Sequence, residues 1–276
     1  MRLGLATMFR SWEDELALAK KHDVKGLRIS ARRRIYAAGM DLVSELIESG
    51  LVVAEVSFHE YNPLTTDRDK LSEQKLFAGQ FIPMMSDIKC SHFLINGGNY
   101  HPSGFQNGDQ RNFTDDALDK SVEQILPLME TAEKHEINIA IEPKFWTVVN
   151  TPERFLQLKD RIGSDRLTIV LDVCNFIAFR EYWRQRETID HLLDKLAGHF
   201  SIVHAKDIHM ETGRHILMHE VQMGAGEIDW VYVMRRLKEY SPDCWLILEH
   251  CREVEETDRG LVWLKAAISR ESIELR

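Results

Sequence analysis

Four residues that could bind a divalent metal ion lie late in four apolar segments of the sequence. The segments are INIAIEP, LTIVLDVC, FSIVHAKD and CWLILEH, and the residues are Glu142, Asp172, His204 and Glu249. Three carboxylates brought together in a poorly hydrated site repel one another, and a divalent cation removes that cost. Their oxygens and one neutral imidazole form a mixed donor set that suits Mn²⁺, with Zn²⁺, Co²⁺, Fe²⁺ or Mg²⁺ as alternatives. Any one of the four could instead be a solvated or salt-bridged strand end, but their recurrence in consecutive segments favours one metal site.

Six more residues near the apolar segments are candidates to contact a small polar substrate. They are Arg28, His59, Trp146, Asn175, Lys206 and Arg252. Lys206 follows His204 by two positions, so both side chains point to the same side of a strand. Its ammonium group could bind a substrate hydroxyl, carboxylate or phosphate, the two arginines could hold an anionic group, and the tryptophan could stack on a sugar ring. Each of the six also has a structural interpretation, as a solvated charge, a member of an ion pair or a core side chain.

The elements that must position these residues alternate along the chain. Eight short apolar runs have the composition of buried strands, at residues 2–8, 24–30, 51–59, 92–97, 137–143, 167–174, 200–207 and 244–250. Amphipathic segments of helical period lie between them, among them residues 11–22, 40–50, 114–135, 151–162 and 228–240. Several of these segments open at a residue that can cap the first helical turn, namely Ser11, Thr114 and Thr151.

Strands that alternate with helices pair in parallel, and parallel strands buried on both faces are continuously apolar. Eight such units without a break in composition predict a closed (β/α)8 TIM barrel, a single domain over residues 1–276, with an open doubly wound sheet as second choice. Active sites of TIM barrels lie at the carboxyl ends of the strands, where the four candidate ligands fall. We expect the irregular segment 96–113 to roof this site. Gly224 and Gly226 in GAGEIDW form a weaker candidate, an anion cradle before a helix.

The motifs IEP, LDVCN, VHAKD, GAGEIDW and LEH resemble those of the xylose isomerase-like barrel superfamily, in particular its sugar phosphate isomerase/epimerase branch. The resemblance covers nearly the whole chain and is most specific from Glu142 to Glu249. It implies that Glu142, Asp172, His204 and Glu249 hold one divalent metal ion. It also implies that the two glutamates form an acid/base pair, which exchanges a proton next to a carbonyl through an enediolate that the metal stabilises. The expected enzyme is a metal-dependent isomerase or epimerase of a small sugar, sugar phosphate or polyol-derived hydroxy-carbonyl compound.

Asn175 departs from the pattern that this resemblance implies. Sugar epimerases of the family often have a histidine three residues after the aspartate, where this chain has LDVCN. An asparagine can bind a substrate hydroxyl but cannot act as an acid or base. A ketohexose epimerase is therefore less favoured, and a dehydratase of the inosose or dehydroshikimate type is an alternative.

Two further alternatives come from other classes of protein. An apurinic-site endonuclease-like hydrolase would need a multinuclear zinc cluster and basic loops that face DNA. The chain has 44 acidic and 35 basic residues and a formal net charge of −9, which argues against a nucleic-acid partner. A non-catalytic sugar- or metal-binding barrel is the other alternative.

The composition is that of an ordinary globular protein, with 44% hydrophobic and 29% charged residues. The sequence has no long apolar run, and acidic residues appear early in its N-terminal segment. Both features predict a cytoplasmic protein without a membrane partner. Four cysteines without C-x-x-C spacing are expected to be reduced thiols. The sequence leaves open the exact substrate, its phosphorylation, the native metal and whether the protein is a homo-oligomer.

Overall fold

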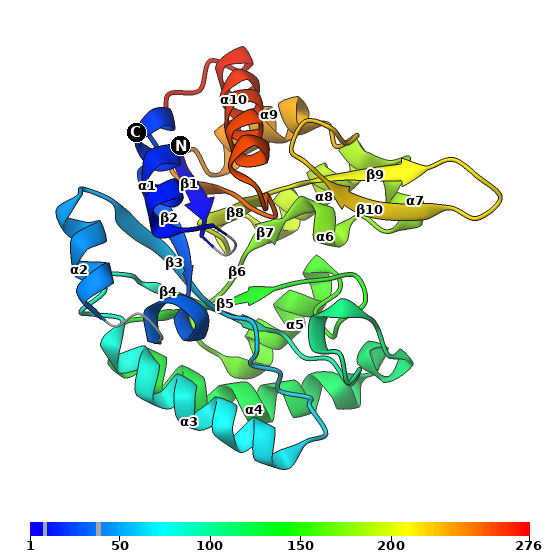
Figure 1. Ribbon diagram of the computed structural model, residues 1–276. Coiled ribbons are helices and arrows are strands. Elements are labelled where there is room, and N and C mark those ends of the chain that lie inside the picture. The colour runs from blue at the N-terminus through cyan, green and yellow to red at the C-terminus, as the bar shows by residue number, and fades with distance from the viewer. Residues whose placement is uncertain (8–9, 37–39) are drawn as a thin grey trace. The chain divides into compact units, whose positions relative to one another are not determined.

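The computed structural model describes residues 1–7, 10–36 and 40–276 of the chain (Figure 1). The chain forms two compact units. The first consists of Met1–Arg28 and Asp172–Arg276, and the second consists of Ile29–Leu171.

A parallel sheet forms the centre of the first unit. Its strands are β1 (Arg2–Ala6), β2 (Gly26–Ser30), β7 (Leu171–Asp172), β8 (Ile202–Ala205) and β11 (Trp245–Leu248). They are ordered β2-β1-β11-β8-β7. Strand β2 extends past the boundary of the unit by two residues, and β7 by one. Strand β1 pairs in parallel with β2 and β11, and β11 pairs in parallel with β8. The continuous apolar runs of the sequence become strands that are almost completely buried.

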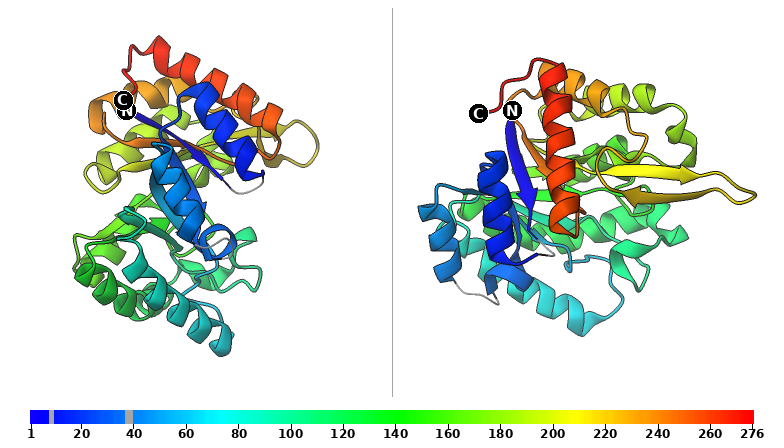
Figure 2. Two further views of the ribbon diagram at one scale, coloured as in Figure 1. Left: turned by 60° about the vertical axis from the view of Figure 1, so that its left-hand side comes forward. Right: turned by 45° about the horizontal axis from the view of Figure 1, so that its top comes forward.

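The helices of the first unit carry the segments between these strands. They are α1 (Trp12–His22), α6 (Val173–Phe176), α7 (Phe179–Tyr182), α8 (Gln185–Leu196), α9 (Trp230–Tyr240) and α10 (Val254–Arg270). The two chain ends lie together in this unit (Figure 2), because the backbone N–H of Arg276 donates to the carbonyl oxygen of Met1 over 3.0 Å.

A two-stranded antiparallel hairpin follows β8 directly. Strand β9 (Asp207–Glu211) continues from β8, and β10 (Leu217–Val221) returns beside it (Figure 1). The sequence pattern does not predict this hairpin, because its strands are partly exposed and mix polar with apolar residues. They lack the apolar run from which buried strands are recognised.

The second unit contains a parallel sheet with the order β6-β5-β4-β3. Its strands are β3 (Val52–Phe58), β4 (His92–Asn96), β5 (Asn138–Glu142) and β6 (Leu167–Ile169). The helices are α2 (Met40–Glu48), α3 (Arg68–Met84), α4 (Asp115–Lys134) and α5 (Pro152–Ile162), with a π-helix at Ala31–Tyr36 and 3₁₀ turns at Gly104–Gln106 and Gln110–Phe113.

Helix α4 illustrates why these segments are helical. Its buried residues recur every three or four positions and form one apolar face, namely Ala117, Leu118, Ser121, Ile125, Leu128, Met129 and Ala132. The hydroxyl of Thr114 accepts the N–H of Ala117 over 3.2 Å and caps the first turn. The caps predicted at Ser11 and Thr151 are likewise confirmed.

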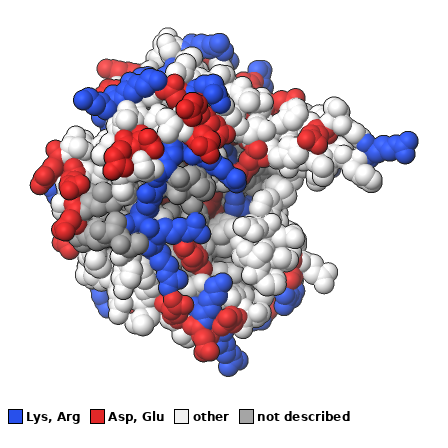
Figure 3. Space-filling model, in the orientation of Figure 1, with Lys and Arg blue, Asp and Glu red and all other residues white. Residues whose placement is uncertain are grey.

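Each of the eight predicted strands contains an observed strand. The run at 167–174 differs in detail, because β6 ends at Ile169 and β7 holds only Leu171 and Asp172. All four cysteines are free and buried. Among the helices of the described ranges, none combines the length and the apolar character that crossing a membrane requires. Acidic and basic side chains are interspersed on the face shown in Figure 3.

Candidate metal centre

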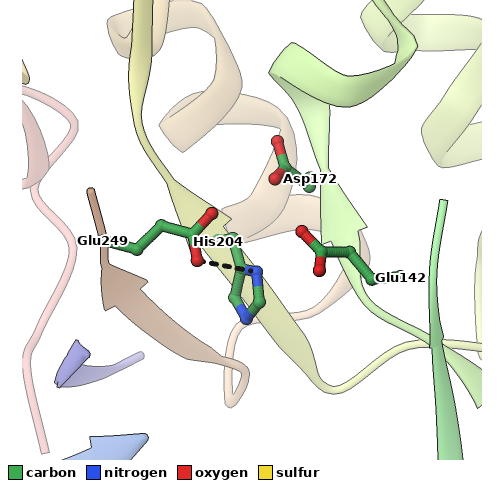
Figure 4. Close-up of side chains that lie close together, drawn as sticks. All are labelled: Glu142, Asp172, His204 and Glu249. Atoms are coloured by element: carbon green, nitrogen blue, oxygen red, sulfur yellow. Dashed lines mark ion pairs between the residues drawn. The ribbon is translucent and has the colours of Figure 1, made fainter. Parts of the chain in front are cut away.

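Three of the four predicted metal ligands come together inside the first unit. Asp172 ends β7, His204 lies in β8, and Glu249 directly follows β11. The pairing of β11 with β8 places Ile247 opposite His204, and the backbone N–H of Glu249 donates to Ala205 over 3.1 Å. This register brings the glutamate beside the histidine, whose Nδ1 lies 3.3 Å from Glu249 Oε2 (Figure 4).

The three side chains are buried and their potential ligand atoms converge. Asp172 and His204 are 0% exposed and Glu249 is 3% exposed. One potential ligand atom from each lies within 4.8 Å of those of the other two. Carboxylate oxygens and an imidazole nitrogen at this spacing form a donor set that fits a divalent ion such as Mn²⁺, Zn²⁺, Co²⁺, Fe²⁺ or Mg²⁺. The cluster could therefore hold a metal ion.

Cations surround Glu249 within the first unit. Arg28 forms a buried ion pair with Glu249 Oε2, and Lys206 Nζ lies 3.5 Å from Oε1. Burial by itself raises the pKa of Glu249, but His204, His250, Arg28 and Lys206 together hold this pKa well below its usual range. The carboxyl group is therefore ionised at neutral pH.

Lys206 lies on the same side of the strand as His204, as the alternation of side chains predicts. It is only 1% exposed. Its ammonium nitrogen lies 2.9 Å from Asp172 Oδ2, and it donates a hydrogen bond of 2.9 Å to Asn175 Oδ1. The same nitrogen lies 3.1 Å from Glu220 Oε1. Lys206 is thus in direct contact with the candidate ligands.

Glu220 and His250 are neighbours of the site that the sequence analysis missed. Glu220 lies on β10, and its Oε2 pairs with His250 Nδ1. The other ring nitrogen of His250 lies 3.5 Å from Glu249 Oε1, and His250 has a left-handed backbone with φ +61°. The position of His250 directly after Glu249 was a usable signal, whereas Glu220 depends on the unpredicted hairpin.

Glu142, the fourth predicted ligand, belongs to the second unit. It is the last residue of β5, lies opposite Asn96 of β4, and is 2% exposed. His59 Nδ1 lies 3.2 Å from Glu142 Oε2, and Lys144 Nζ lies 4.0 Å from Oε1. His59 is among the residues predicted from the sequence. Lys144 is not, although it follows Glu142 by two positions.

Aromatic side chains lie beside His59 and Lys144, the two partners of Glu142. Phe105, from the irregular segment 96–113, meets the His59 ring edge-to-face with 5.5 Å between ring centroids. Lys144 Nζ lies 5.5 Å from the centroids of both Phe105 and Trp146. The indole N–H of Trp146 donates to the carbonyl oxygen of Phe105 over 2.8 Å. The segment 96–113 thus contributes to the surroundings of Glu142.

The remaining predicted residues are placed as follows. Asn175 is buried, its side chain accepts from Lys206, and its N–H donates to Asp172 Oδ1 over 3.2 Å. Arg28 is buried against Glu249. Arg252 is exposed, and its backbone N–H donates to Glu256 over 2.7 Å.

The anion cradle at Gly224 and Gly226 was a wrong interpretation. The carboxylate of Asp207 accepts both of their N–H groups over 3.1 Å, and it also accepts those of Ile208 and Ile228. A side-chain carboxylate of the chain itself therefore fills the cradle. These bonds join the beginning of β9 to the segment that follows β10.

The chain belongs to the xylose isomerase-like TIM barrel family, whose sequence profile matches residues 15–267. This confirms the family resemblance and the TIM barrel fold that the sequence predicts. No functionally curated protein matches the chain.

Several solved structures share this fold at low sequence identity. A D-tagatose 3-epimerase-like protein is 17% identical, with a TM-score of 0.78 over 99% of this chain and 98% of its own. The IolI protein with a bound zinc atom is 16% identical, with a TM-score of 0.75 over 98% and 99%. The probable 3-DHS dehydratase AsbF from Bacillus anthracis is 15% identical, with a TM-score of 0.74 over 96% and 99%.

Proposed function

We propose that the protein is a divalent-metal-dependent isomerase or epimerase of a small sugar, sugar phosphate or polyol-derived hydroxy-carbonyl compound. The observation that carries this proposal is the buried convergence of Asp172, His204 and Glu249, with Lys206 beside them. Buried carboxylates that converge with an imidazole at strand ends favour a metal-dependent enzyme over a purely structural cluster.

We propose Glu142 as the fourth ligand, with one metal ion, Mn²⁺ as first choice, shared by the four residues. The support is its equivalent place at the end of a parallel strand and its burial. When bound, the metal supplies Lewis-acid polarisation of a carbonyl oxygen. The transfer of protons is the task of the two glutamates.

The surroundings of each carboxylate are compatible with the proposed acid/base roles. Nearby cations lower the pKa of Glu249 and keep it ionised, and the ionised form is the one that a proton acceptor requires. Glu142 is flanked by His59 and Lys144, two groups that can exchange protons or bind substrate oxygens. We assign proton removal and return to this pair of glutamates.

Substrate contacts are proposed for the polar side chains that border the carboxylates. Lys206 and Asn175 would bind hydroxyl, carboxylate or phosphate oxygens on the side of Glu249, and His59 and Trp146 would do so on the side of Glu142. Arg28 acts through Glu249, which it orients, and the exposed Arg252 remains a candidate for an anionic group.

A dehydratase of the same superfamily is the second candidate. The observation in its favour is Asn175, whose side chain accepts from Lys206 and has no acid or base function. Loss of water from a hydroxy-carbonyl compound needs one base for the C–H bond and one acid for the leaving hydroxyl. Lys206 is a cationic donor close enough to Glu249 to serve as that acid.

A deuterium-exchange experiment tests both candidates. The protein is loaded with Mn²⁺ and incubated in D₂O with a panel of ketoses, inososes and hydroxy acids, and the products are followed by NMR and mass spectrometry. Deuterium on the carbon next to the carbonyl supports an isomerase or epimerase, and loss of water supports a dehydratase. Retained metal without either reaction over the panel would favour a binding protein.

A further inference from the structure

Lys206 is shared between candidate metal ligands and a residue outside them. Its ammonium group lies 2.9 Å from Asp172 and 3.5 Å from Glu249, which both belong to the converging donor cluster. It also lies 3.1 Å from Glu220, which does not belong to that cluster among the described residues. The lysine is 1% exposed, whereas the side chain of Glu220 is 41% exposed.

An ammonium group and a divalent ion compete for the same carboxylate oxygens. A divalent ion bound to Asp172 and Glu249 would engage the carboxylate oxygens that interact with Lys206. It would also repel the ammonium group. A buried cation without an anionic partner is strongly unfavourable. Glu220 provides a carboxylate that Lys206 can keep when the other two are engaged.

The hairpin places Glu220 beside Lys206. Its carboxylate is held from both sides, by Lys206 through Oε1 and by His250 through Oε2. Asp207, next to Lys206 in the chain, accepts N–H groups from Gly224 and Gly226 and so fixes the base of the hairpin. The end of β10 that carries Glu220 is therefore anchored close to the strand that carries Lys206.

We propose that Glu220 is a positioning residue, which holds the Lys206 ammonium beside the metal ligands and thereby permits a divalent ion to bind them. The inference rests on the proposed metal site and deepens it. It makes the β9–β10 hairpin part of the site, and it makes metal affinity depend on a residue that need not touch the metal.

A double-mutant cycle tests this coupling. Metal is removed from the full chain with a chelator, and Mn²⁺ affinity is measured by calorimetry and by the electron paramagnetic resonance signal of free Mn²⁺. The proteins are the unsubstituted chain, Glu220→Gln, Lys206→Met and the double variant. Glu220→Gln should weaken Mn²⁺ binding on the order of tenfold, the size of one charge-assisted hydrogen bond. In the Lys206→Met background the same substitution should change affinity less than about twofold.

A matched control comes from the other strand of the hairpin. Glu211 lies on β9 and pairs with His219 over 2.9 Å. Glu211→Gln removes the same charge from the same hairpin and should leave Mn²⁺ affinity unchanged. Circular dichroism and thermal unfolding of each metal-free variant verify that the fold is retained.

The outcomes separate this inference from the proposed function. An unchanged affinity in Glu220→Gln, or an equal loss with and without Lys206, overturns the positioning role while the metal site stands. The equal loss would mean that Glu220 acts only by its negative charge. If the unsubstituted chain binds none of Mn²⁺, Zn²⁺, Co²⁺, Fe²⁺ and Mg²⁺, the proposed function fails, and the positioning role fails with it.

Discussion

Substitution of Arg28 by methionine should destabilise the first unit by leaving a buried carboxylate without its arginine partner. The side chains of Arg28 and Glu249 are 2% and 0% exposed, so water cannot replace the guanidinium. Removal of one partner from a buried ion pair costs about 3–5 kcal/mol of unfolding free energy. Lys206 and His204 remain near Glu249 and reduce this cost, so we expect the metal-free variant to fall near the lower end of the range.

The destabilisation should depend on pH with a definite sign. The folded pKa of Glu249 lies well below its ordinary value, so its contribution to stability is present above the ordinary pKa of a glutamate, about 4.3. That contribution is lost as the pH falls toward the folded pKa. Without Arg28 the pKa of Glu249 rises, so the stability difference between the two proteins should be largest at neutral pH and should shrink below about pH 4.

Urea unfolding of the metal-free proteins at pH 7 and at about pH 3 measures this difference. The double variant Arg28→Met/Glu249→Gln should regain part of the lost stability, because it no longer buries a carboxylate that has lost its arginine partner. The control is Arg276→Met, since Arg276 pairs with Asp243 over 2.8 Å and both side chains are about two-thirds exposed. It should cost less than about 1 kcal/mol. Equal costs for Arg28→Met and Arg276→Met would refute the reasoning.

Four other substitutions give independent checks. Glu142→Gln and Glu249→Gln should each abolish turnover of any substrate found while circular dichroism stays unchanged, and a near-normal rate in either would contradict its acid/base role. His204→Ala should lower the metal retained after dialysis, measured by elemental analysis; undiminished metal would exclude it as a ligand. Gly226→Ala should destabilise the protein by about 1–3 kcal/mol in thermal unfolding, because the added Cβ would overlap the carboxylate of Asp207; an unchanged transition would contradict that packing.

The sequence by itself determined the buried parallel strands and the place of the candidate ligands at their ends. A strand buried on both faces must be continuously apolar, so a charged residue at its end is visible in the pattern. The same holds for helix caps, which depend only on residues three positions apart, such as Thr114 and Ala117. These features depend on residues that are close together in the chain, so they can be predicted from the sequence pattern.

Helix α3 shows where local patterns fail. Its segment RDKLSEQKLFAGQFIPM contains Gly79 and Pro83, residues that usually signal turns, and the sequence analysis did not predict it. In the structure Phe77 stacks on Phe81 with ring centroids 5.6 Å apart, and Phe81 stacks on Phe93 of β4 at 5.9 Å. Packing against the sheet therefore outweighs the weak helical signal of the segment.

The partners of the site residues were decided only by the tertiary structure. Arg28 and Glu249 are 221 positions apart, and periodicity carries no information about contacts between such distant residues. Glu220 reaches Lys206 because β10 of a partly exposed hairpin folds back beside β9. The glycines of GAGEIDW bind Asp207 rather than an external anion. The sequence specified which groups could do chemistry, whereas pairing between distant strands specified the charges that surround each of them.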